Sequence, residues 1–412
     1  MNLETGSAVA VAVGWGVLVC LCVASAAGSV GVVVPTAQDI RMAHAASMAG
    51  ELCPIRGHSK TNILGTMGNA KPMRVVVAGC GGISNVWFKS INSKPEIEVV
   101  GLVDFVAAAA EKQRDVYGLA GAHIYGSLDA ALRACAPDIV FDLTVPDAHA
   151  DNVIVALEHG CHVLTEKPMA HTMPDARRAL AASRSAGLQY AVMQNRRYSS
   201  GIRRMRALLN SGVLGTLTTV HVDFFVGAHF GGFRDHMAHV LLLDMAIHTF
   251  DAIRFVSGAD ATGVYCMEWN PQGSWYDRDA SAVAIFEMTH GIVSTYRGSW
   301  SSEGKSTSWE SQWRFIGTNG TAVWDGNDVI DAETIRPDPG LVFRHAYDVV
   351  IPSALAVLPV DHAHDSCIRD FIACVQEGRC PLTSASDNIK SLAMVFGAIE
   401  SADSGEHVTL VD

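Results

Sequence analysis

The chain has few basic residues and no recognisable cysteine motif. Its 30 Lys and Arg residues stand against 42 Asp and Glu residues, which gives a formal net charge of −12 at pH 7. This excess of acid disfavours nucleic acid or an anionic membrane as the main partner. The 10 cysteines form no CxxC pair, and no Cys/His group has the spacing of a zinc site. We therefore expect reduced thiols in a cytoplasmic protein, with no disulfide framework and no bound metal.

The sequence also has no internal repeat and no low-complexity linker. Hydrophobic residues make up 49% of the 412 residues, and charged residues make up only 17%. This composition is typical of well-packed globular domains and argues against a disordered chain. Because the chain is longer than one hydrophobic core usually accommodates, we expect two domains and an extension.

Residues 1–72 are the expected extension, and their first half is almost without charge. No charged residue occurs in residues 5–38, and the apolar run within residues 8–36 is long enough to enter a bilayer. A secretory signal would carry basic residues before such a run, yet only Glu4 precedes it, and no twin arginine is present. Ala24-Ser25-Ala26 nevertheless resembles a cleavage site.

Two interpretations of this extension stay open. In one, it exports the protein or anchors it in a membrane, and only then would a membrane be a partner. In the other, which we favour, the start codon is assigned too far upstream, and the true start is Met67 or Met73. The globular pattern begins abruptly at Met73, so trimming residues 1–66 should leave folding and activity intact.

Strand and helix patterns alternate between residues 73 and 192. Short runs of Val, Ile and Leu are typical of buried strands, and the longer amphipathic segments between them are typical of helices. This alternation predicts an α/β domain with a doubly wound parallel sheet. Strands are expected at 75–78, 98–104, 139–144, 161–165 and 190–193, and helices at 84–92, 107–117, 150–159 and 176–186.

Residues 193–412 are expected to form a second domain that is rich in β-structure. Thr289-His290-Gly291 is a hairpin signal, and Asn319-Gly320 is a stronger one because both residues accept positive φ. Strands joined by tight turns predict a largely antiparallel sheet. Strands are expected at 280–288, 292–300, 313–316 and 322–324, and helices at 202–210, 365–376 and 389–402.

A glycine-rich loop follows the first expected strand. Gly79 permits a tight turn, and Gly81 and Gly82 let backbone N–H groups approach a pyrophosphate at the start of the next helix. Ser84 occupies the position of the third glycine in the dinucleotide fingerprint. Asp104, at the end of the second expected strand, can accept both ribose hydroxyls and repels a 2′-phosphate. We therefore predict a dinucleotide site that favours NAD, with NADP possible.

Lys167 is expected at the carboxyl end of a strand, where open α/β sheets bind their ligands. Pro168 favours an extended conformation of Lys167, and the bond between them can be cis. An ammonium group at this position can stabilise an alkoxide as it develops from a substrate hydroxyl. The alternative is a surface lysine with no role in catalysis.

Asp244, His248 and Asp251 are spaced to share one face of a nearly apolar helix. Acidic and imidazole groups in such a segment must be paired or must open into a polar cavity. Because histidine can accept a proton near neutral pH, we predict that His248 is a general base next to Asp244. A structural core histidine is the alternative. Metal binding is less favoured, since only His236, His239 and residues 361–365 could add ligands.

The ordered set of motifs resembles the glucose–fructose oxidoreductase and inositol dehydrogenase family, Gfo/Idh/MocA. The resemblance covers residues 73–412 and implies an N-terminal Rossmann domain. It also implies a C-terminal α/β domain whose open sheet often forms oligomer contacts, and hence a homo-oligomer, either a dimer or a tetramer. The motifs that carry it are Gly79-Cys80-Gly81-Gly82-Ile83-Ser84, Thr144-x-Pro146-x-x-His149, Glu166-Lys167-Pro168 and Asp244-x-x-x-His248-x-x-Asp251.

The resemblance also implies roles for single residues. Lys167 and His248 would be catalytic, and Asp244 would bind the substrate and tune His248. Asn195 and Arg197 would line the substrate pocket, although a structural hinge at this junction is an equal alternative. The implied cofactor-binding residues are Gly79, Gly81, Gly82, Ile83, Ser84, Asp104, Thr144, Pro146, His149, Glu166 and Lys167.

The expected function is hydride transfer between NAD(P) and a CH–OH group of a sugar, a polyol or a related cyclic alcohol. Two alternatives stay open. One is glycoside cleavage with tightly bound NAD, and the other is a non-enzymatic regulator that binds a dinucleotide. The loops at residues 227–238 and 269–278 are expected to set the specificity.

Overall fold

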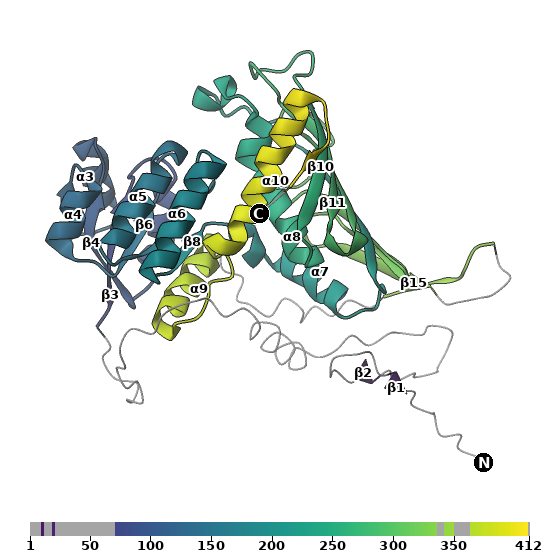
Figure 1. Ribbon diagram of the computed structural model, residues 1–412, viewed down its shortest axis with the longest axis horizontal. Coiled ribbons are helices and arrows are strands. Elements are labelled where there is room, and N and C mark those ends of the chain that lie inside the picture. The colour runs from purple at the N-terminus through teal and green to yellow at the C-terminus, as the bar shows by residue number, and fades with distance from the viewer. Residues whose placement is uncertain (1–9, 12–18, 21–70, 336–341, 350–362, 411–412) are drawn as a thin grey trace. The chain divides into compact units, whose positions relative to one another are not determined.

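The computed structural model describes residues 71–335, 342–349 and 363–410, and the short strands β1 (Ala10–Val11) and β2 (Val19–Cys20) (Figure 1). Strands β1 and β2 pair in antiparallel orientation. The predictions for residues 1–72 otherwise lie outside the described residues. Within the described part, no helix combines the length and the apolar character that crossing a membrane requires.

The chain divides into two compact units, which are described separately. Among the described residues, the parallel-sheet unit contains residues 71–198 and 363–393. The mixed-sheet unit contains residues 199–335, 342–349 and 394–410.

A parallel sheet of six strands forms the centre of the first unit, in the order β5-β4-β3-β6-β7-β8. Its central strands are buried on both faces, which explains their continuous runs of Val, Ile and Leu. This order is that of a doubly wound dinucleotide-binding fold, so the predicted fold of this region is confirmed. The strands are β3 (Met73–Ala78), β4 (Ile97–Val103), β5 (His123–Tyr125), β6 (Ile139–Asp142), β7 (His162–Thr165) and β8 (Tyr190–Val192).

Helices cover both faces of this sheet. One hydrophobic core joins α2, α3 and the distant helix α9, and its largest side chains include Trp87, Phe141 and Phe371. The ring of Phe141 lies 5.3 Å from that of Trp87 and 6.5 Å from that of Phe371. The helices are α2 (Ser84–Ile91), α3 (Ala107–Val116), α4 (Leu128–Cys135), α5 (Pro146–Glu158), α6 (Met173–Ala186) and α9 (Ala363–Glu377).

The sequence analysis missed β5 and α4, and it started α5 at Ala150 instead of Pro146. The signals for α4 were present, because the Ser127 side chain caps the helix by accepting from the Ala130 N–H. Arg133 pairs with Asp129 one turn earlier. Pro146 occupies the first turn of α5, where its missing N–H costs nothing.

A sheet of nine strands forms the second unit, in the order β16-β15-β14-β13-β9-β12-β11-β10-β17. Only β9 and β12 pair in parallel, and the other neighbouring strands are antiparallel. The prediction of a largely antiparallel sheet is therefore confirmed. The strands are β9 (Leu217–Phe225), β10 (Ala261–Trp269), β11 (Ser281–Met288), β12 (Val293–Ser299), β13 (Gln312–Gly317), β14 (Gly320–Trp324), β15 (Ile330–Ile335), β16 (Ala346–Asp348) and β17 (Val408–Thr409).

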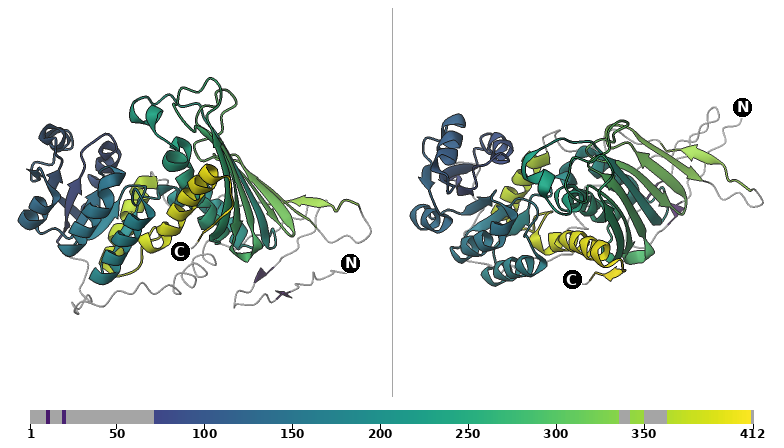
Figure 2. Two further views of the ribbon diagram at one scale, coloured as in Figure 1. Left: turned by 45° about the horizontal axis from the view of Figure 1, so that its top comes forward. Right: turned by 90° about the horizontal axis from the view of Figure 1, so that it is seen from above.

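Helices cover one face of this sheet (Figure 2). Helices α7 (Ser200–Asn210) and α8 (Ile247–Ser257) pack against each other, and the end of α10 (Ala385–Ser404) packs against β10. Gly201 allows α7 to approach β14 closely, because a Cβ atom there would lie 2.1 Å from the Trp324 ring.

Both predicted hairpins are present, between β11 and β12 and between β13 and β14. The expected backbone of the second hairpin is wrong, because neither Asn319 nor Gly320 has a positive φ. Gly320 lies instead within β14, where a Cβ atom would approach the Glu333 carbonyl oxygen to 2.3 Å. Strands β9, β10, β15, β16 and β17 were also missed, although Val220, Val222 and Phe224 of β9 alternate with polar residues as in a half-buried strand.

Candidate functional site

At its first position, the glycine loop has a backbone conformation that only glycine adopts without strain. Gly79 has a φ of +93°, and a Cβ atom there would lie 2.5 Å from the Leu143 carbonyl oxygen. At Gly81 and Gly82 an added Cβ atom would meet nothing within 4 Å. The Ser84 hydroxyl donates to the Gly81 carbonyl at 2.6 Å and fixes the loop to the start of α2. The loop therefore leaves open space in front of a helix N-terminus, as a pyrophosphate requires.

Asp104 connects the glycine loop to the end of β4. Its Oδ2 atom accepts from the Cys80 N–H at 2.9 Å, and its Oδ1 atom accepts from the Val106 N–H at 2.8 Å. These bonds hold the carboxylate beside the loop, and each oxygen keeps a lone pair for a further donor. Its role in binding the ribose hydroxyls stays a prediction.

A buried polar network follows the end of β6. Asp142 is fully buried, and its Oδ1 atom accepts from the Thr144 hydroxyl at 2.6 Å and from Asn152 Nδ2 at 3.3 Å. The Thr165 hydroxyl, on the neighbouring strand β7, donates to Oδ2 of the same carboxylate at 3.4 Å. Asp142 and Asn152 were missed by the sequence analysis. They hold the Thr144 turn at the carboxyl edge of the sheet.

His149 links the Thr144 turn to the segment after β7. Its Nδ1 atom lies 2.7 Å from the Pro168 carbonyl oxygen, and its Nε2 atom lies 3.0 Å from the Thr144 carbonyl oxygen. The imidazole is fully buried. Within α5, Pro146 begins the helix that carries His149. His149 therefore joins the Thr144 turn to the Pro168 segment at the carboxyl edge of the sheet.

Lys167 follows β7 at the same edge of the sheet as the glycine loop, and its bond to Pro168 is cis. The preceding Glu166 is buried, and its Oε1 atom accepts from Trp87 Nε1 at 2.6 Å. Its Oε2 atom accepts from the Lys167 N–H at 3.0 Å. Trp87 is a further residue that the sequence analysis missed, because it lies on α2, far from Glu166 in the sequence.

Asn195 and Arg197 both contact the C-terminal helices within the parallel-sheet unit. Asn195 Nδ2 lies 3.0 Å from His364 Nδ1 on α9. Arg197 is buried, and its guanidinium donates to the Leu382 carbonyl at 2.9 Å and pairs with Asp387 at 2.6 Å. These contacts favour the alternative in which Arg197 is part of a structural hinge, because two of its guanidinium nitrogens already have partners within the protein.

Asp244 and His248 lie on either side of a change in helix type. Leu241–Ala246 is a π-helical turn that continues into α8 at Ile247. Such turns are rare and occur often at functional sites. Asp244 and His248 are partly exposed within an otherwise mostly buried segment. Asp251 is buried, so it does not share their exposed face.

Arg234 holds the Asp244 carboxylate. Its Nε atom donates to Oδ2 at 2.8 Å, and its Nη2 atom donates to Oδ1 at 3.3 Å. A bidentate pair of this kind fixes the orientation of a carboxylate as well as its charge. The sequence analysis missed Arg234, and no motif connects it to Asp244.

The residues considered as metal ligands have other partners. His236 pairs with Asp277, and His239 pairs with Glu268, at 2.6 Å in both cases. The hydrogen bond to Glu268 raises the pKa of His239. In the described part of the chain, no group of three His, Cys, Asp or Glu side chains is arranged to hold a metal ion.

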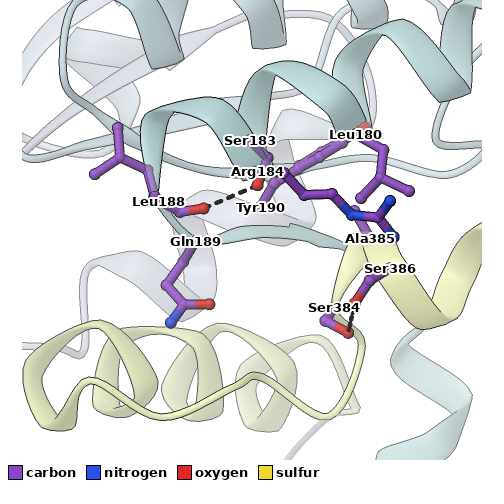
Figure 3. A pocket seen from close by; sticks show the side chains of 10 residues that line it. Leu180, Ser183, Arg184, Leu188, Gln189, Tyr190, Ser384, Ala385 and Ser386 are labelled. Atoms are coloured by element: carbon purple, nitrogen blue, oxygen red, sulfur yellow. Dashed lines mark hydrogen bonds between the residues drawn. The ribbon is translucent and has the colours of Figure 1, made fainter. Parts of the chain in front are cut away.

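A cavity of about 230 Å³ lies elsewhere in the parallel-sheet unit, between α6 and the start of α10 (Figure 3). Its lining includes Arg184, Gln189 and Ser386. Because residues 187–189 precede β8, the cavity lies at the amino edge of the sheet, opposite Gly79 and Lys167. It is therefore separate from the candidate cofactor edge.

The residues at the carboxyl edge fit a dinucleotide. The glycine turn leaves space at a helix N-terminus, and an acid follows β4 beside it. A polar turn follows β6, and a lysine follows β7. These features define a Rossmann-type oxidoreductase that binds NAD.

The comparisons identify the family. The chain belongs to the Gfo/Idh/MocA oxidoreductases. The model described as "Oxidoreductase family, NAD-binding Rossmann fold" matches residues 73–194, and the model of the GFO/IDH/MocA C-terminal domain matches residues 202–323. The predictions of the family, of an NAD-dependent dehydrogenase and of NAD as cofactor are therefore confirmed.

Three similar proteins illustrate the relationship. An uncharacterised protein of Sinorhizobium fredii, y4oX, is 28% identical over 81% of this chain and 95% of its own length. D-apiose dehydrogenase of Paraburkholderia graminis is 26% identical over 84% of this chain and 92% of its own. An oxidoreductase of Agrobacterium radiobacter, crystallised with NAD⁺, L-tartaric acid and magnesium, has the same fold. It has a TM-score of 0.72 and 20% identity over 82% of this chain and 99% of its own.

Proposed function

We propose that the protein transfers a hydride between NAD and a CH–OH group of a cyclic sugar or polyol. One observation carries the proposal. The glycine loop, Asp104, the Thr144 turn and Lys167 follow four neighbouring parallel strands, β3, β4, β6 and β7, and so meet at one edge of the sheet. Ligands of doubly wound sheets bind at this edge. The relationship to D-apiose dehydrogenase, whose name states a sugar substrate, supports the substrate class.

We propose the following roles for the chain's own residues. His248 takes the proton of the substrate hydroxyl, and Asp244 orients the substrate and stabilises the charged imidazole. Lys167 donates a hydrogen bond to the same oxygen and stabilises the negative charge that develops there. Arg234 keeps Asp244 in place. Bound NAD supplies the hydride acceptor.

A substrate screen tests this proposal. Purified protein should reduce NAD⁺ with at least one neutral sugar or polyol of a broad panel, measured as NADH absorbance. Replacing Lys167 with Ala or His248 with Asn should lower kcat by about 10²–10⁴-fold, because the first change removes the donor that stabilises the developing negative charge and the second removes the proton acceptor.

Matched controls are available on the surface. Lys89, in the last turn of α2, and His290, in the β11–β12 hairpin, are both exposed. Lys89→Ala and His290→Asn should leave kcat unchanged. The proposal fails if no alcohol is oxidised, or if the two site variants retain full activity. Release of sugar from an aryl glycoside without net NADH would point to the glycosidase alternative.

We also propose that the protein is a homo-oligomer that associates through the face of the mixed sheet that no described helix covers, called the uncovered face below. Large apolar side chains are exposed on neighbouring strands of this face, and Tyr265 of β10 pairs in register with Ile285 of β11. Contiguous apolar surface of this kind is rare on monomers. Met267 and Trp269 of β10 and Val293 of the next strand, β12, are further exposed apolar residues.

We propose a cytoplasmic location. Six of the seven cysteines between residues 71 and 410 are buried as free thiols, as small apolar residues are in a reducing compartment. Burial raises the pKa of the Cys80 thiol in the glycine loop to about 12, and the Asp104 charge acts in the same direction. Fractionation of cells that express the full chain tests the location.

A further inference from the structure

The loop after β9 and the loop after β10 are joined by hydrogen bonds and stacking. Trp275 Nε1 and the Tyr276 hydroxyl both donate to the Ala228 carbonyl oxygen, at 3.0 and 2.6 Å. The His229 ring stacks on the Trp275 ring, with centroids 3.6 Å apart. The two loops that the sequence analysis expected to set the specificity therefore form one structured wall of the mixed-sheet unit.

Aromatic rings continue this wall. Phe230 packs edge-on against Trp300 at 5.2 Å, and Trp309 packs against Trp300 at 5.6 Å and lies 6.3 Å from Phe230. Trp300 is buried against Phe224, whereas Phe230 and Trp309 are 46% and 51% exposed. Phe230 and Trp309 thus pack on the buried Trp300 ring, and this contact restricts their motion before a ligand binds.

Arg234 connects these rings to Asp244. Its Cζ atom lies 5.0 Å from the centroid of Phe230 and 4.8 Å from that of Phe233, and Phe233 is 68% exposed. The same guanidinium forms the bidentate pair with Asp244. Exposed aromatic rings therefore adjoin the carboxylate to which we assign substrate binding.

Ion pairs balance several of the charges at this wall, and Asp235 adds a negative charge. Arg234 pairs with Asp244, and His236 pairs with Asp277, whose N–H donates to the Asp235 carbonyl oxygen. Burial raises the pKa of Tyr276, the charges of Asp235 and Asp244 act in the same direction, and Trp275 and the Arg234 charge oppose them. A field of this sign opposes the approach of an anionic ligand.

We propose that Phe230, Phe233 and Trp309 form the surface that recognises the substrate ring, and that this surface selects neutral cyclic sugars over open-chain polyols and sugar acids. The inference rests on the proposed function and names the substrate class more narrowly. These three residues are called the aromatic surface below.

The preference follows from the shape and charge of the ligand. A pyranose or cyclitol ring presents a rigid face of C–H groups that packs on an aromatic ring, while its hydroxyls remain at the rim for polar partners such as Asp244. An open-chain polyol has no fixed face and loses more conformational entropy on binding. A sugar acid carries the charge that the surrounding carboxylates repel.

Steady-state kinetics of surface variants test the inference. Phe233→Ala and Trp309→Ala should each raise the KM for the best cyclic substrate by about three- to tenfold, the value of one aromatic contact, with little change in kcat. The KM for NAD should not change. Phe343→Ala is the matched control, because Phe343 is 86% exposed and precedes β16, whose start lies at the opposite end of the sheet from the wall.

A binding measurement without turnover separates this inference from the proposed function. Tryptophan fluorescence of the protein without added NAD should change on titration with methyl β-D-glucopyranoside or myo-inositol, and much less with D-sorbitol or D-glucuronate. The change should be lost in Trp309→Phe. If the wild type binds the ring sugars in this way but oxidises no alcohol, the proposed function fails and the inference stands.

Three results would overturn the inference. The first is an unchanged sugar KM in both alanine variants of an active enzyme. The second is tighter binding of D-glucuronate than of its neutral analogue. The third is a change in oligomer mass in Phe233→Ala without a change in sugar affinity, which would assign the aromatic surface to a second copy of the chain.

Discussion

We propose that the Asp104 carboxylate serves both the fold and the cofactor. Its two oxygens bind the Cys80 and Val106 N–H groups, so the side chain is fixed beside the glycine loop before any ligand arrives. A fixed negative charge at the end of β4 accepts ribose hydroxyls and repels a 2′-phosphate. We therefore propose that this single charge sets the preference for NAD.

Replacing Asp104 with Ser should change the cofactor preference. Serine keeps a hydrogen-bond acceptor but removes the charge, so the ratio of kcat/KM for NADP to that for NAD should rise by at least about tenfold. Asp115→Ser, at an exposed acid on α3, is the control. An unaltered ratio in Asp104→Ser would refute the assignment.

Local pattern explains which site residues the sequence could predict. Gly79, Asp104 and Lys167 each follow a buried run of apolar residues, and the position of a residue after a strand is visible in sequence. The partners of these residues were not predictable. Trp87 donates to Glu166 and Arg234 pairs with Asp244 only because loops and helices fold back on one another.

The glycine loop is the element whose backbone matters most. Gly79→Ala should lower Tm by about 5 °C, because alanine at positive φ is strained and its Cβ atom would lie 2.5 Å from a carbonyl oxygen. Gly81→Ala should leave Tm unchanged, since its Cβ atom meets nothing within 4 Å. Thermal unfolding measures both effects.

The same pair of variants tests whether NAD binds at the glycine loop. Gly81→Ala fills space that a pyrophosphate would occupy, so its affinity for NAD, measured by titration calorimetry, should fall although the fold is intact. Equal affinity in Gly81→Ala and the wild type would show that the cofactor does not approach this part of the loop.

Helix α9 is held to the parallel-sheet unit by a buried ion pair. Lys94, at the end of the segment after α2, pairs with Asp365 in the first turn of α9 and also donates to the Ser90 carbonyl at 3.1 Å. The Lys94 side chain is 3% exposed. The sequence analysis considered Asp365 as a possible metal ligand, and the structure gives it this ion pair instead.

Removing one partner of this pair should destabilise the protein. Asp365→Asn leaves the Lys94 charge buried and should cost about 3–5 kcal/mol in the free energy of unfolding. Asp129→Asn weakens the exposed pairs with Arg133 and His159 and should have a much smaller effect, because solvent screens these charges. Chemical denaturation measures both, and equal effects would contradict the burial argument.

The pair should also make stability depend on pH. Burial acts to raise the pKa of Asp365, but the hydrogen bonds from Arg369 and Lys94 lower it on balance below its ordinary value of 3.8. A lowered pKa in the folded state contributes stability that is present above the ordinary value and is lost as the pH falls through the lowered one. The difference between the wild type and Asp365→Asn should therefore shrink in acid.

For the whole molecule, the uncovered face of the mixed sheet predicts association. Ile285→Asp places a charge in the exposed apolar stripe and should dissociate the oligomer without destabilising the chain, because Ile285 is 45% exposed. Phe343→Asp, outside the stripe, is the control. Light scattering after size exclusion gives the mass, and a monomeric wild type or an unchanged mass in Ile285→Asp would contradict the proposal.

The sequence alone determined which candidate functional residues follow which strands along the chain. The parallel sheet, the glycine turn and the lysine at a strand end follow from periodicity and from the steric limits of glycine and proline, which act between neighbouring residues. The tertiary structure decided the rest: that α9 completes the core of the parallel-sheet unit, that His149 clamps Pro168, and that Arg234 holds Asp244 beside exposed aromatic rings. Contacts of this kind depend on how distant segments pack, and no local pattern encodes them.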